Sequence, residues 1–492
     1  MITAPDTTTR DAATGWTATD LINGVPGELG ASMDVINPAT GRVCGQVSYP
    51  DDALAREGAT RAADAAAAAL ADWGNAPARV RSDLLLAAVD VLRGRVDEIA
   101  YVLAIEAGKR LPEALAEVRF SSEYLKWFAE EIRRPRGEFF TSEDNGRRQL
   151  SLRRPLGVVA SLTPWNFPVS IQARKVAPAL AAGCTVVARV SEKAPLAVTI
   201  WLKALHDAGL PDGVLNLVHG DARTVTGALL DHRGVRGVSF TGSTAVGSAI
   251  MAQAASRIVR PMLELGGNAP MIVHDDADLD HALAQAELAK LRNTGQSCVG
   301  VNRFLVHRSV AAEFSARLAA RFDALSLGDG TSDPVPDVGP VIDADRVSAV
   351  NGLVAEAIAA GGRRLTADRT LPADGCWVAP TLLVDVPDDC RLATEEVFGP
   401  AAGVFVFDTD AEALELANRT EMGLAAYVFT TDPARAFTFA EQLEAGIVGI
   451  NDALPTVSFT PMGGIKQSGL GREGGSEGLA EFQEVHYLAW RP

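Results

Sequence analysis

The chain has 492 residues, too many for a single hydrophobic core, and its length predicts two or three domains. Its formal net charge of −17 argues against nucleic acid or an anionic membrane as a main partner, because both bind basic surfaces. Hydrophobic residues make up 47% and charged residues 22%, which excludes wholesale disorder. No apolar run approaches the roughly 20 residues that span a bilayer, and residues 1–15 lack the apolar core of a signal peptide.

The cysteine content indicates a reducing compartment. An odd number of cysteines without paired spacing is typical of cytoplasmic proteins, in which cysteine serves packing or chemistry rather than cross-linking. We therefore expect a cytoplasmic protein. The cysteines are Cys44, Cys184, Cys298, Cys376 and Cys390.

The first predicted elements are three long amphipathic helices rich in Ala and Leu, over residues 52–73, 79–107 and 112–133. A hairpin follows, because Asn145-Gly146 lies between two short strand-like runs at 137–140 and 149–152, and both turn residues tolerate positive φ. The hairpin interrupts helical surroundings, so we expect it to pair with a segment from elsewhere.

From residue 157 onward, predicted strands and helices alternate, which indicates a parallel α/β sheet, the usual host of a nucleotide. A second α/β region occupies roughly residues 265–450. The strands of the first region are expected at 157–162, 184–189, 214–218 and 235–240, and its helices at 170–182, 195–208, 223–231 and 244–256.

Two glycine-rich segments are candidates for a dinucleotide loop. The segment from Gly469 to Gly474 matches G-x-G-x-x-G, but no predicted strand precedes it and too little chain follows for a βαβ unit, so we interpret it as a turn-rich segment. The segment 240–247, Phe-Thr-Gly-Ser-Thr-Ala-Val-Gly, ends an apolar strand and opens a helix, where free backbone N–H groups suit a pyrophosphate. The alternative is that Gly242 serves turn geometry only.

Three residues are candidates for catalysis. Cys298 follows the small residues Asn-Thr-Gly-Gln-Ser beyond a predicted helix, although a lone cysteine is more often a buried small hydrophobe. Glu264 ends a strand and precedes Leu-Gly-Gly-Asn, where it could also be merely solvated or paired. Asn166 lies in Thr-Pro-Trp-Asn-Phe-Pro, whose prolines fix a loop at the sheet edge where ligands bind; the alternative is a Pro-rich turn capped by asparagine.

Together with further motifs, these segments resemble the aldehyde dehydrogenase family over nearly the whole chain. Eight segments occur in the family's order, so chance similarity is implausible, and Cys298, Glu264 and Asn166 form a coherent set. The additional segments are Asn-Pro-Ala-Thr-Gly at 37–41, Glu-Ala-Gly-Lys at 106–109, Glu-Glu-Val-Phe-Gly-Pro at 395–400 and Gly-Gly-Ile-Lys-Gln-Ser-Gly at 463–469.

The resemblance implies oxidation of an aldehyde to a carboxylic acid. An aldehyde does not release hydride until a nucleophile makes its carbonyl tetrahedral, which a thiolate does well at neutral pH. Cys298 would attack, and the Asn166 amide with the Cys298 backbone N–H would hold the oxyanion. After hydride transfer, Glu264 would activate water to hydrolyse the thioester. Family members that transfer the acyl group to coenzyme A generally lack this glutamate.

The expected cofactor is NAD, with NADP left open. Glu192 can accept a hydrogen bond from a ribose 2′-hydroxyl and would repel a 2′-phosphate. The family usually has Lys and Pro where this chain has Arg189 and Val190, and Arg189 could offset part of that repulsion. The resemblance assigns cofactor contacts to Trp165, Asn166, Arg189, Glu192, Gly242, Ser243, Leu265, Glu396 and Phe398. We expect no metal.

Within the family, the chain is most similar to the succinate-semialdehyde dehydrogenases, in which two arginines grip the distal carboxylate of the substrate. These match Arg174 and Arg292, whose alternative role is surface ion pairing. An assisting hydroxyl would come from Thr456 or Ser458, in a loop where Pro455 departs from the group. That departure leaves glutarate semialdehyde, a sulfonated aldehyde or broad specificity as alternatives.

The expected architecture therefore has three parts. A Rossmann-like cofactor domain comprises 1–133 and 155–264, and an α/β catalytic domain comprises 265–455. The hairpin at 134–154 and the tail at 456–492 would bridge to a second subunit, giving a homodimer or homotetramer. The alternative from another class is a catalytically silent binding protein of the same fold.

Overall fold

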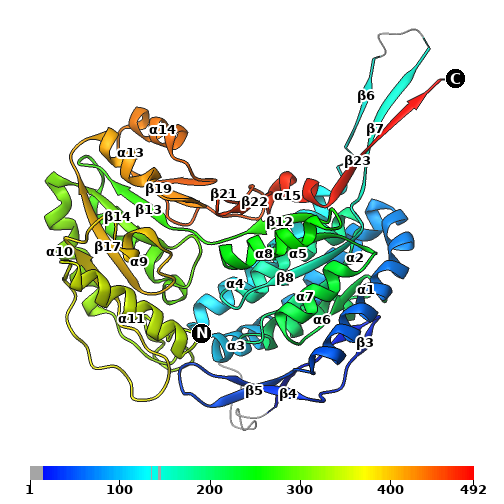
Figure 1. Ribbon diagram of the computed structural model, residues 1–492, viewed down its shortest axis with the longest axis horizontal. Helices are drawn as coiled ribbons and strands as arrows, with labels where there is room; N and C mark the ends of the chain where they lie inside the picture. Colours follow the sequence, from blue (N-terminus) through cyan, green and yellow to red (C-terminus); the bar gives the residue numbers. More distant parts are fainter. Residues whose placement is uncertain (1–14, 135, 142–145, 492) are drawn as a thin grey trace.

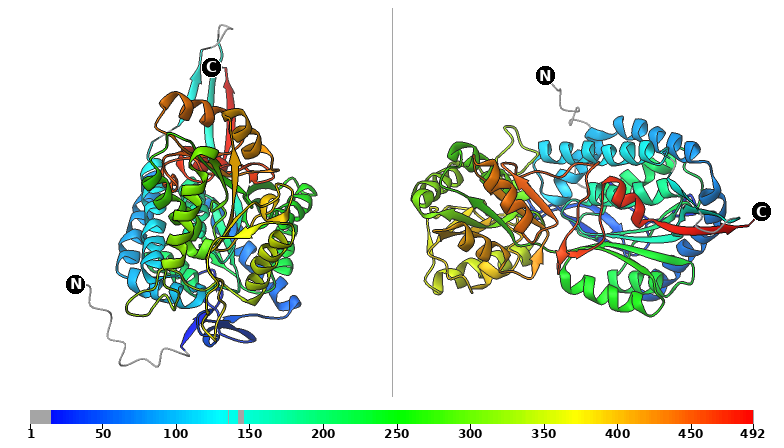
Figure 2. Two further views of the ribbon diagram at one scale, coloured as in Figure 1. Left: turned by 90° about the vertical axis from the view of Figure 1, so that its left-hand side faces the viewer. Right: turned by 90° about the horizontal axis from the view of Figure 1, so that it is seen from above.

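The computed structural model describes residues 15–134, 136–141 and 146–491. The chain forms two lobes, and a narrow three-stranded sheet projects from one of them (Figures 1 and 2). Each lobe is built on its own mostly parallel sheet, so the expected mixed α/β class is confirmed. No helix among the described residues is long and apolar enough to cross a membrane.

The larger lobe contains an eight-stranded sheet in the order β22-β12-β11-β8-β9-β10-β2-β3. Its central strands β10, β9, β8, β11 and β12 are parallel, so their carboxyl ends meet at one edge. The strands are β2 (Leu21–Ile22), β3 (Val25–Pro26), β8 (Val158–Thr163), β9 (Thr185–Val190), β10 (Leu215–Leu217), β11 (Val235–Thr241), β12 (Arg260–Glu264) and β22 (Gly469–Leu470).

Helices cover both faces of this sheet, because its strands are apolar on both sides. One face packs against α1 (Asp52–Asn75), α7 (Ala222–Asp231) and α8 (Thr244–Ala255). The other packs against α2 (Ala78–Arg93), α3 (Val96–Ala107), α4 (Leu111–Glu131), α5 (Pro168–Ala182) and α6 (Leu196–Asp207). A small sheet of β1 (Trp16–Ala18), β5 (Val43–Ser48) and β4 (Ser32–Ile36) adjoins this lobe.

The strand and helix alternation expected from residue 157 onward is confirmed, with each element's ends within about two residues. The single helix expected over 79–107 is wrong. The structure has two helices, α2 and α3, because the chain leaves the helical conformation at Arg95, just after Gly94. The acidic residues Asp97 and Glu98 lie in the first turn of α3, where they complement the helix dipole.

The smaller lobe contains a seven-stranded sheet in the order β15-β16-β17-β14-β13-β19-β20, with β20 at one edge. Its strands are β13 (Ala269–Val273), β14 (Val301–His307), β15 (Arg363–Arg364), β16 (Thr381–Val384), β17 (Ala401–Phe407), β19 (Ala425–Phe429) and β20 (Ile447–Ile450). Its helices are α9 (Leu279–Leu291), α10 (Arg308–Ala324), α11 (Ala344–Ala359), α12 (Arg391–Thr394), α13 (Asp410–Asn418) and α14 (Pro433–Gln442).

The projecting sheet has the order β23-β7-β6. The two strands of the expected hairpin, β6 (Gly137–Phe140) and β7 (Arg148–Pro155), pair antiparallel, as the sequence predicts. Residues 142–145, which include the Asn145 turn position, lie outside the described residues. The partner from elsewhere is β23 (Gln483–Trp490), which pairs with β7 along its whole length.

The C-terminal segment returns to the large lobe before it forms β23. β21 (Ile465–Lys466) pairs with β18 (Met422–Gly423), and β22 pairs with the end of β12, placing Gly469 opposite Glu264. The chain then forms α15 (Gly475–Glu481). The segment from Gly469 to Gly474 therefore comprises the edge strand β22 and the turn that leads to α15, and it does not open a cofactor helix.

A buried carboxylate joins two helices of the large lobe. Glu106, at the end of α3, accepts hydrogen bonds from the Leu196 N–H at 2.6 Å and the Ala197 N–H at 2.8 Å. These N–H groups open α6, so Glu106 caps a helix that begins 90 residues further along the chain. Complete burial raises the pKa of Glu106 to about 8.

We predict that Glu106→Ala lowers the free energy of unfolding by about 1–3 kcal/mol, because two buried N–H groups lose their acceptor. The measurement is urea denaturation followed by circular dichroism. Glu98→Ala is the matched control on the same helix: Glu98 forms only a partly exposed pair with Arg95 at 3.0 Å, worth about 0–1 kcal/mol. Equal losses in the two variants would contradict the capping role.

Candidate active site

Cys298 follows a backbone segment with an unusual conformation. After α9, the 3₁₀ turn η2 (Arg292–Gly295) contains Asn293, Thr294 and Gly295 with φ of 52°, 55° and 75°. Left-handed conformations of non-glycine residues are strained and persist only where surrounding contacts hold them. They turn the chain away from the helix before it reaches Cys298.

Contacts from several segments hold this turn. The Gln296 side chain accepts a hydrogen bond from the Ile342 N–H at 2.9 Å, and the Tyr427 hydroxyl donates to the Val299 carbonyl at 2.7 Å. The Thr294 hydroxyl donates to the Gly339 carbonyl at 3.1 Å. Residues on both sides of Cys298 are therefore fixed, which gives the sulfur a defined position.

Asn166 connects the large lobe to the same turn. It lies between β8 and α5, and its side-chain amide donates to the Gln296 carbonyl at 3.2 Å, while the Asn293 amide donates to the Asn166 carbonyl at 2.9 Å. The NH2 group of Asn166 has two hydrogens, so one remains for a ligand. The sequence predicts that Asn166 and Cys298 belong to one site, and these bonds bring their segments together.

Glu264 ends β12 and is 3% exposed. Its Oε1 atom has no hydrogen-bond partner among the described residues. Burial, followed by repulsion from Glu473, raises the pKa of Glu264 to about 8. The chain beyond Glu264 runs against the segment that carries Cys298: a Cβ on Gly267 would lie 2.4 Å from the Cys298 carbonyl oxygen, so only glycine fits there.

The surroundings of Cys298 disfavour its thiolate. Burial of the thiol, with repulsion from Glu264, raises the pKa of Cys298 to about 12. The Arg174 guanidinium acts in the opposite direction on both groups. The thiol and the carboxyl are thus electrostatically coupled members of one site.

A buried ion network missed by the sequence analysis lies beside Glu264. Glu473 accepts a hydrogen bond from Lys175 at 2.5 Å, and its other oxygen lies 3.5 Å from the Arg174 Nε. All three side chains are buried. Lys175 stands next to Arg174 in the segment Gln-Ala-Arg-Lys, and Glu473 lies inside the glycine motif dismissed as a cofactor loop. The sequence signal for this network is that Lys175 and Glu473 each lie inside a motif, which the sequence analysis considered only for Arg174 and for its glycines.

The remaining cofactor candidates gather at the carboxyl edge of the large sheet. Glu396 accepts from the Gly267 N–H at 3.3 Å, and the rings of Trp165 and Phe398 meet edge to face at 5.5 Å between centroids. Gly247 of α8 packs on Leu265, since a Cβ there would lie 2.4 Å from a Leu265 methyl carbon.

Buried polar atoms without hydrogen-bond partners indicate that a ligand binds at the carboxyl edge of the large sheet. Within the described residues, the Thr163 and Thr241 hydroxyls, at the ends of β8 and β11, have no hydrogen-bond partner, and neither has the Arg189 Nε at the end of β9. Ser243 caps the first turn of α8 after Gly242. Such orphaned polar atoms beside a helix N-terminus fit a nucleotide with its phosphates.

The adenosine-side residues Arg189 and Glu192 form an ion pair at 2.6 Å. Arg189 also donates to the Gly220 carbonyl at 3.1 Å. The arginine is therefore held by the neighbouring carboxylate and a loop carbonyl.

The fold brings only some of the expected substrate residues into the same region. Arg174 is buried on α5, where it donates to the Met462 sulfur, and the Arg292 guanidinium stacks over the Phe167 ring at 4.9 Å. Ser458 is buried and Thr456 half-buried. Within the described residues, no hydrogen bond or ion pair joins either hydroxyl to an arginine.

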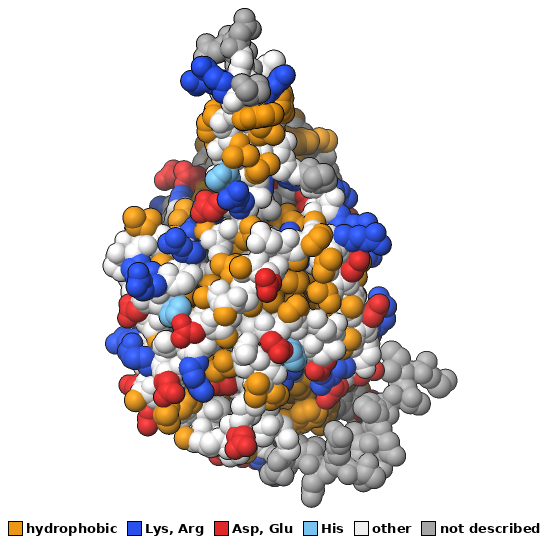
Figure 3. Space-filling model, turned by 90° about the vertical axis from the view of Figure 1, so that its right-hand side faces the viewer, with side chains coloured by type: hydrophobic (Ala, Val, Ile, Leu, Met, Phe, Trp, Pro, Cys, Tyr) orange, Lys and Arg blue, Asp and Glu red, His pale blue; other side chains and the backbone are white. Residues whose placement is uncertain are grey.

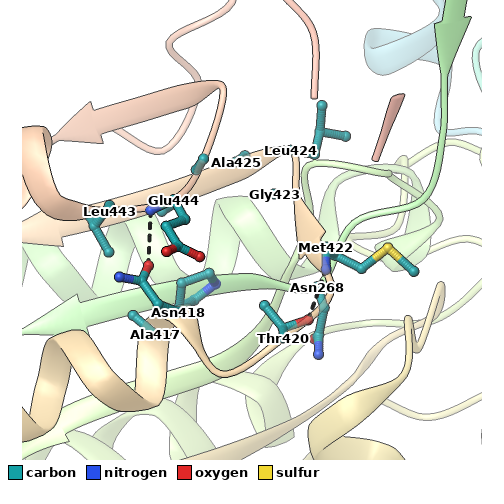
Figure 4. A pocket seen from close by; sticks show the side chains of 13 residues that line it. Asn268, Ala417, Asn418, Thr420, Met422, Gly423, Leu424, Ala425, Leu443 and Glu444 are labelled. Carbon is teal, nitrogen blue, oxygen red and sulfur yellow. Dashed lines mark hydrogen bonds between the residues drawn. The ribbon is translucent and has the colours of Figure 1, made fainter. Parts of the chain in front are cut away.

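A separate small cavity lies between Asn268 and the loop from Asn418 to Gly423 (Figure 4). Its volume of about 10 Å³ accommodates at most one water molecule. Asn418 accepts from the Glu444 N–H at 2.9 Å on its rim. This cavity is too small for an aldehyde.

The comparisons with known proteins agree with this geometry. The aldehyde dehydrogenase family model matches residues 25–488. A succinate-semialdehyde dehydrogenase of Paenarthrobacter nicotinovorans is 43% identical, covering 88% of this chain and 96% of its own. A glutarate-semialdehyde dehydrogenase of Pseudomonas putida is 40% identical, covering 95% and 96%. The crystal structure of an NADP-dependent enzyme of E. coli is 39% identical, with a TM-score of 0.94 over 97% of this chain and 98% of its own.

The fold, the carboxyl-edge site with a cysteine and a glutamate, and these comparisons lead to one assignment. The chain belongs to the aldehyde dehydrogenase family. It is an oxidoreductase that uses NAD or NADP to oxidise an aldehyde to the carboxylic acid.

We predict that Asn166→Ala lowers kcat by roughly 10²–10³, the usual cost of losing one oxyanion donor. Cofactor binding, measured by protein fluorescence quenching, should change much less. A loss below about threefold would mean that Asn166 only shapes the loop.

Proposed function

We propose that this protein is a dehydrogenase of anionic semialdehydes, such as succinate semialdehyde. The main support for this proposal is the buried Arg174. Its Nε has no hydrogen-bond partner among the described residues, and the Glu473 carboxylate oxygen lies 3.5 Å from it. A guanidinium held in the protein interior near Cys298 and Glu264 is suited to a substrate carboxylate. Arg292, half-buried over Phe167, supplies a second positive charge.

In the proposed reaction, the Cys298 sulfur attacks the aldehyde carbon, and the Asn166 amide with the Cys298 N–H stabilises the oxyanion. The dinucleotide, when bound, accepts the hydride. Glu264 then removes a proton from water, which attacks the thioester and releases the acid and the Cys298 thiol. Thr456 or Ser458 would assist at the distal end of the substrate.

For the cofactor, we propose a preference for NAD. Glu192 would accept from the ribose 2′-hydroxyl, and its charge would repel a 2′-phosphate. The ion pair with Arg189 supports this proposal, because it engages a guanidinium that could otherwise bind a phosphate there. Gly242, Ser243, Leu265 and Glu396 complete the proposed cofactor contacts with Trp165 and Phe398.

The alternatives concern the substrate. The glutarate-semialdehyde relative favours a longer dicarboxylic semialdehyde as the second candidate. A sulfonated aldehyde would also suit paired guanidinium groups. Broad specificity would require the arginines to serve structure only, and a silent binding protein would have no need of Cys298, Glu264 and Asn166 together.

We further propose a cytoplasmic homodimer or homotetramer, with cofactor domain 1–133 and 155–264, catalytic domain 265–455, and bridging segments 134–154 and 456–492. The support is the projecting sheet, which carries hydrophobic side chains far from the core (Figure 3). A second copy would cover them. The exposed residues on it include Phe139, Phe140, Leu152, Val485, Leu488 and Trp490.

We predict that Cys298→Ala abolishes oxidation, whereas Glu264→Gln still releases a burst of NADH and then turns over slowly. Acylation survives in the second variant, but hydrolysis lacks its base. In the wild type, hydrolysis should slow as pH falls through about 8, because the raised pKa protonates Glu264 below it. Stopped-flow absorbance resolves both phases. Normal steady-state turnover in either variant would refute the assignment.

We predict that Arg174→Ala or Arg292→Ala lowers kcat/KM for succinate semialdehyde by about one to two orders of magnitude, the value of one charge-assisted contact. Oxidation of the uncharged 4-methylpentanal, which has a similar shape, should be affected little by Arg292→Ala. It should be affected less than that of succinate semialdehyde by Arg174→Ala, which also removes a charge that acts on Cys298 and Glu264. Arg321→Ala is the control at the surface, where Arg321 pairs with Glu287 at 2.7 Å. Equal losses for both aldehydes would make the arginines structural.

We predict that Glu192→Gln raises kcat/KM for NADP relative to NAD by about tenfold, since a repulsive charge disappears and Arg189 becomes free. Initial rates with each cofactor at one fixed aldehyde concentration give the ratio. Glu57→Gln, which makes the same charge change on α1, should leave the ratio unchanged. An unaltered ratio in Glu192→Gln would remove this residue from cofactor selection.

A further inference from the structure

A second concave site lies on the large lobe, at the opposite end of the parallel strands from Cys298. It is an open groove of about 990 Å³ where α1 ends, β7 enters the lobe and the chain turns into β11. β8 and β11 begin here, at Val158 and Val235, whereas Asn166 follows the carboxyl end of β8 and Glu264 ends β12. The groove is therefore separate from the catalytic site.

The lining of this groove is strongly basic. No aspartate or glutamate lines it, and within the described residues no carboxylate lies within 4.0 Å of any arginine that does. Glu484, which faces Arg154 across the β7–β23 pair, instead binds Arg260 at 2.8 Å. We call this site the arginine groove; its arginines are Arg233, Arg236 and Arg257 of the large lobe, together with Arg153 and Arg154, which lie in the segment proposed above to bridge subunits.

Local contacts orient two of these side chains. Arg257 donates to the Leu230 carbonyl at 3.1 Å and to the His232 carbonyl, which fixes its guanidinium. The stem of Arg236 lies over Gly157, where φ is 134° and a Cβ would approach its Cγ to 2.8 Å. Glycine at 157 thus makes room for Arg236 beside the groove.

A further cation, Arg81, lies beneath the arginine groove. Arg81 is 7% exposed and donates to the Ala181 carbonyl at 2.9 Å, but within the described residues it has no carboxylate partner. A Cβ on Gly183 would lie 3.5 Å from the Arg81 guanidinium carbon and 2.9 Å from Pro155, which lines the groove. Its charge adds to that of the five lining arginines.

Such a concentration of like charge has an energetic cost without a counter-ion. The chain as a whole carries −17, so acidic residues are plentiful, yet none pairs with this set among the described residues. Planar guanidinium groups bind phosphate oxygens in a bidentate manner, and several arginines match several phosphates. The groove volume is that of a small-molecule site rather than of a single-ion site.

We propose that the arginine groove binds a small anion that carries two or more phosphate groups, outside the catalytic site. A nucleic acid is disfavoured by the chain's net charge and by the confinement of the basic residues to one concavity. Two sources share the chemistry, a nucleoside triphosphate and an inorganic polyphosphate.

The test is isothermal titration of the full chain with sodium tripolyphosphate, ATP and inorganic phosphate. Saturating NAD is present throughout, so that the cofactor site cannot contribute. We expect saturable binding of tripolyphosphate, weaker binding of phosphate, and affinity that falls with added NaCl. If ATP binds as tightly as tripolyphosphate, the groove recognises the phosphates alone. If ATP binds more tightly, the groove also contacts the nucleoside.

The double variant Arg233→Gln/Arg236→Gln should weaken tripolyphosphate binding by about 10- to 100-fold, because two charge-assisted contacts are lost. Its aldehyde oxidation without polyphosphate should stay at the wild-type rate, which also verifies folding. The matched control Arg42→Gln/Arg56→Gln removes two exposed charges outside the groove and should bind normally.

Three outcomes overturn the proposal. The first is no binding of tripolyphosphate up to about 10 mM, far weaker than a specific site. The second is an equal loss of affinity in the groove and control variants. The third is a lower sedimentation mass of the groove variant, which would make the groove a contact between copies of this chain.

Discussion

The site depends on one buried carboxylate from the C-terminal segment. Arg174 and Lys175 are adjacent on α5 and both buried, and two uncompensated cations in the interior would be strongly destabilising. Glu473 supplies the counter-charge, at 2.5 Å from Lys175 and 3.5 Å from Arg174. This requirement ties the segment after β22 to α5, close to where β22 pairs with the end of β12 beside Glu264.

The second constraint is the left-handed turn that precedes Cys298. Its contacts come from both lobes: Asn166 follows β8 of the large lobe, whereas Ile342 and Tyr427 belong to the small one. The strained residues can persist only where these partners are all in place. The geometry around Cys298 is thus a property of the lobe–lobe junction, and a change in that junction would be transmitted to the sulfur.

The sequence predicts the strand and helix alternation well, because each strand of the large sheet is an apolar run bounded by turn residues. It also predicts that Cys298, Glu264 and Asn166 belong together. It does not predict the Glu473 network, since the partners are almost 300 residues apart and no local pattern encodes the pairing. The break at Arg95 was missed because the apolar periodicity continues through Gly94, and only the acids that follow signal a new helix.

In the proposed reaction, the electrostatic coupling of Cys298 and Glu264 imposes an order on the steps. Burial, with added repulsion from Glu264, raises the pKa of Cys298 to about 12, so ionising both groups at once is unfavourable. The proposed reaction needs only one negative charge at a time: the thiolate during attack, and the carboxylate during hydrolysis, when the sulfur is an uncharged thioester. Arg174 lowers the pKa of either group in turn. A substrate anion bound to Arg174 would offset this stabilisation. If Arg292 also binds that anion, Arg174 keeps more of its effect on the pKa of Cys298 and Glu264.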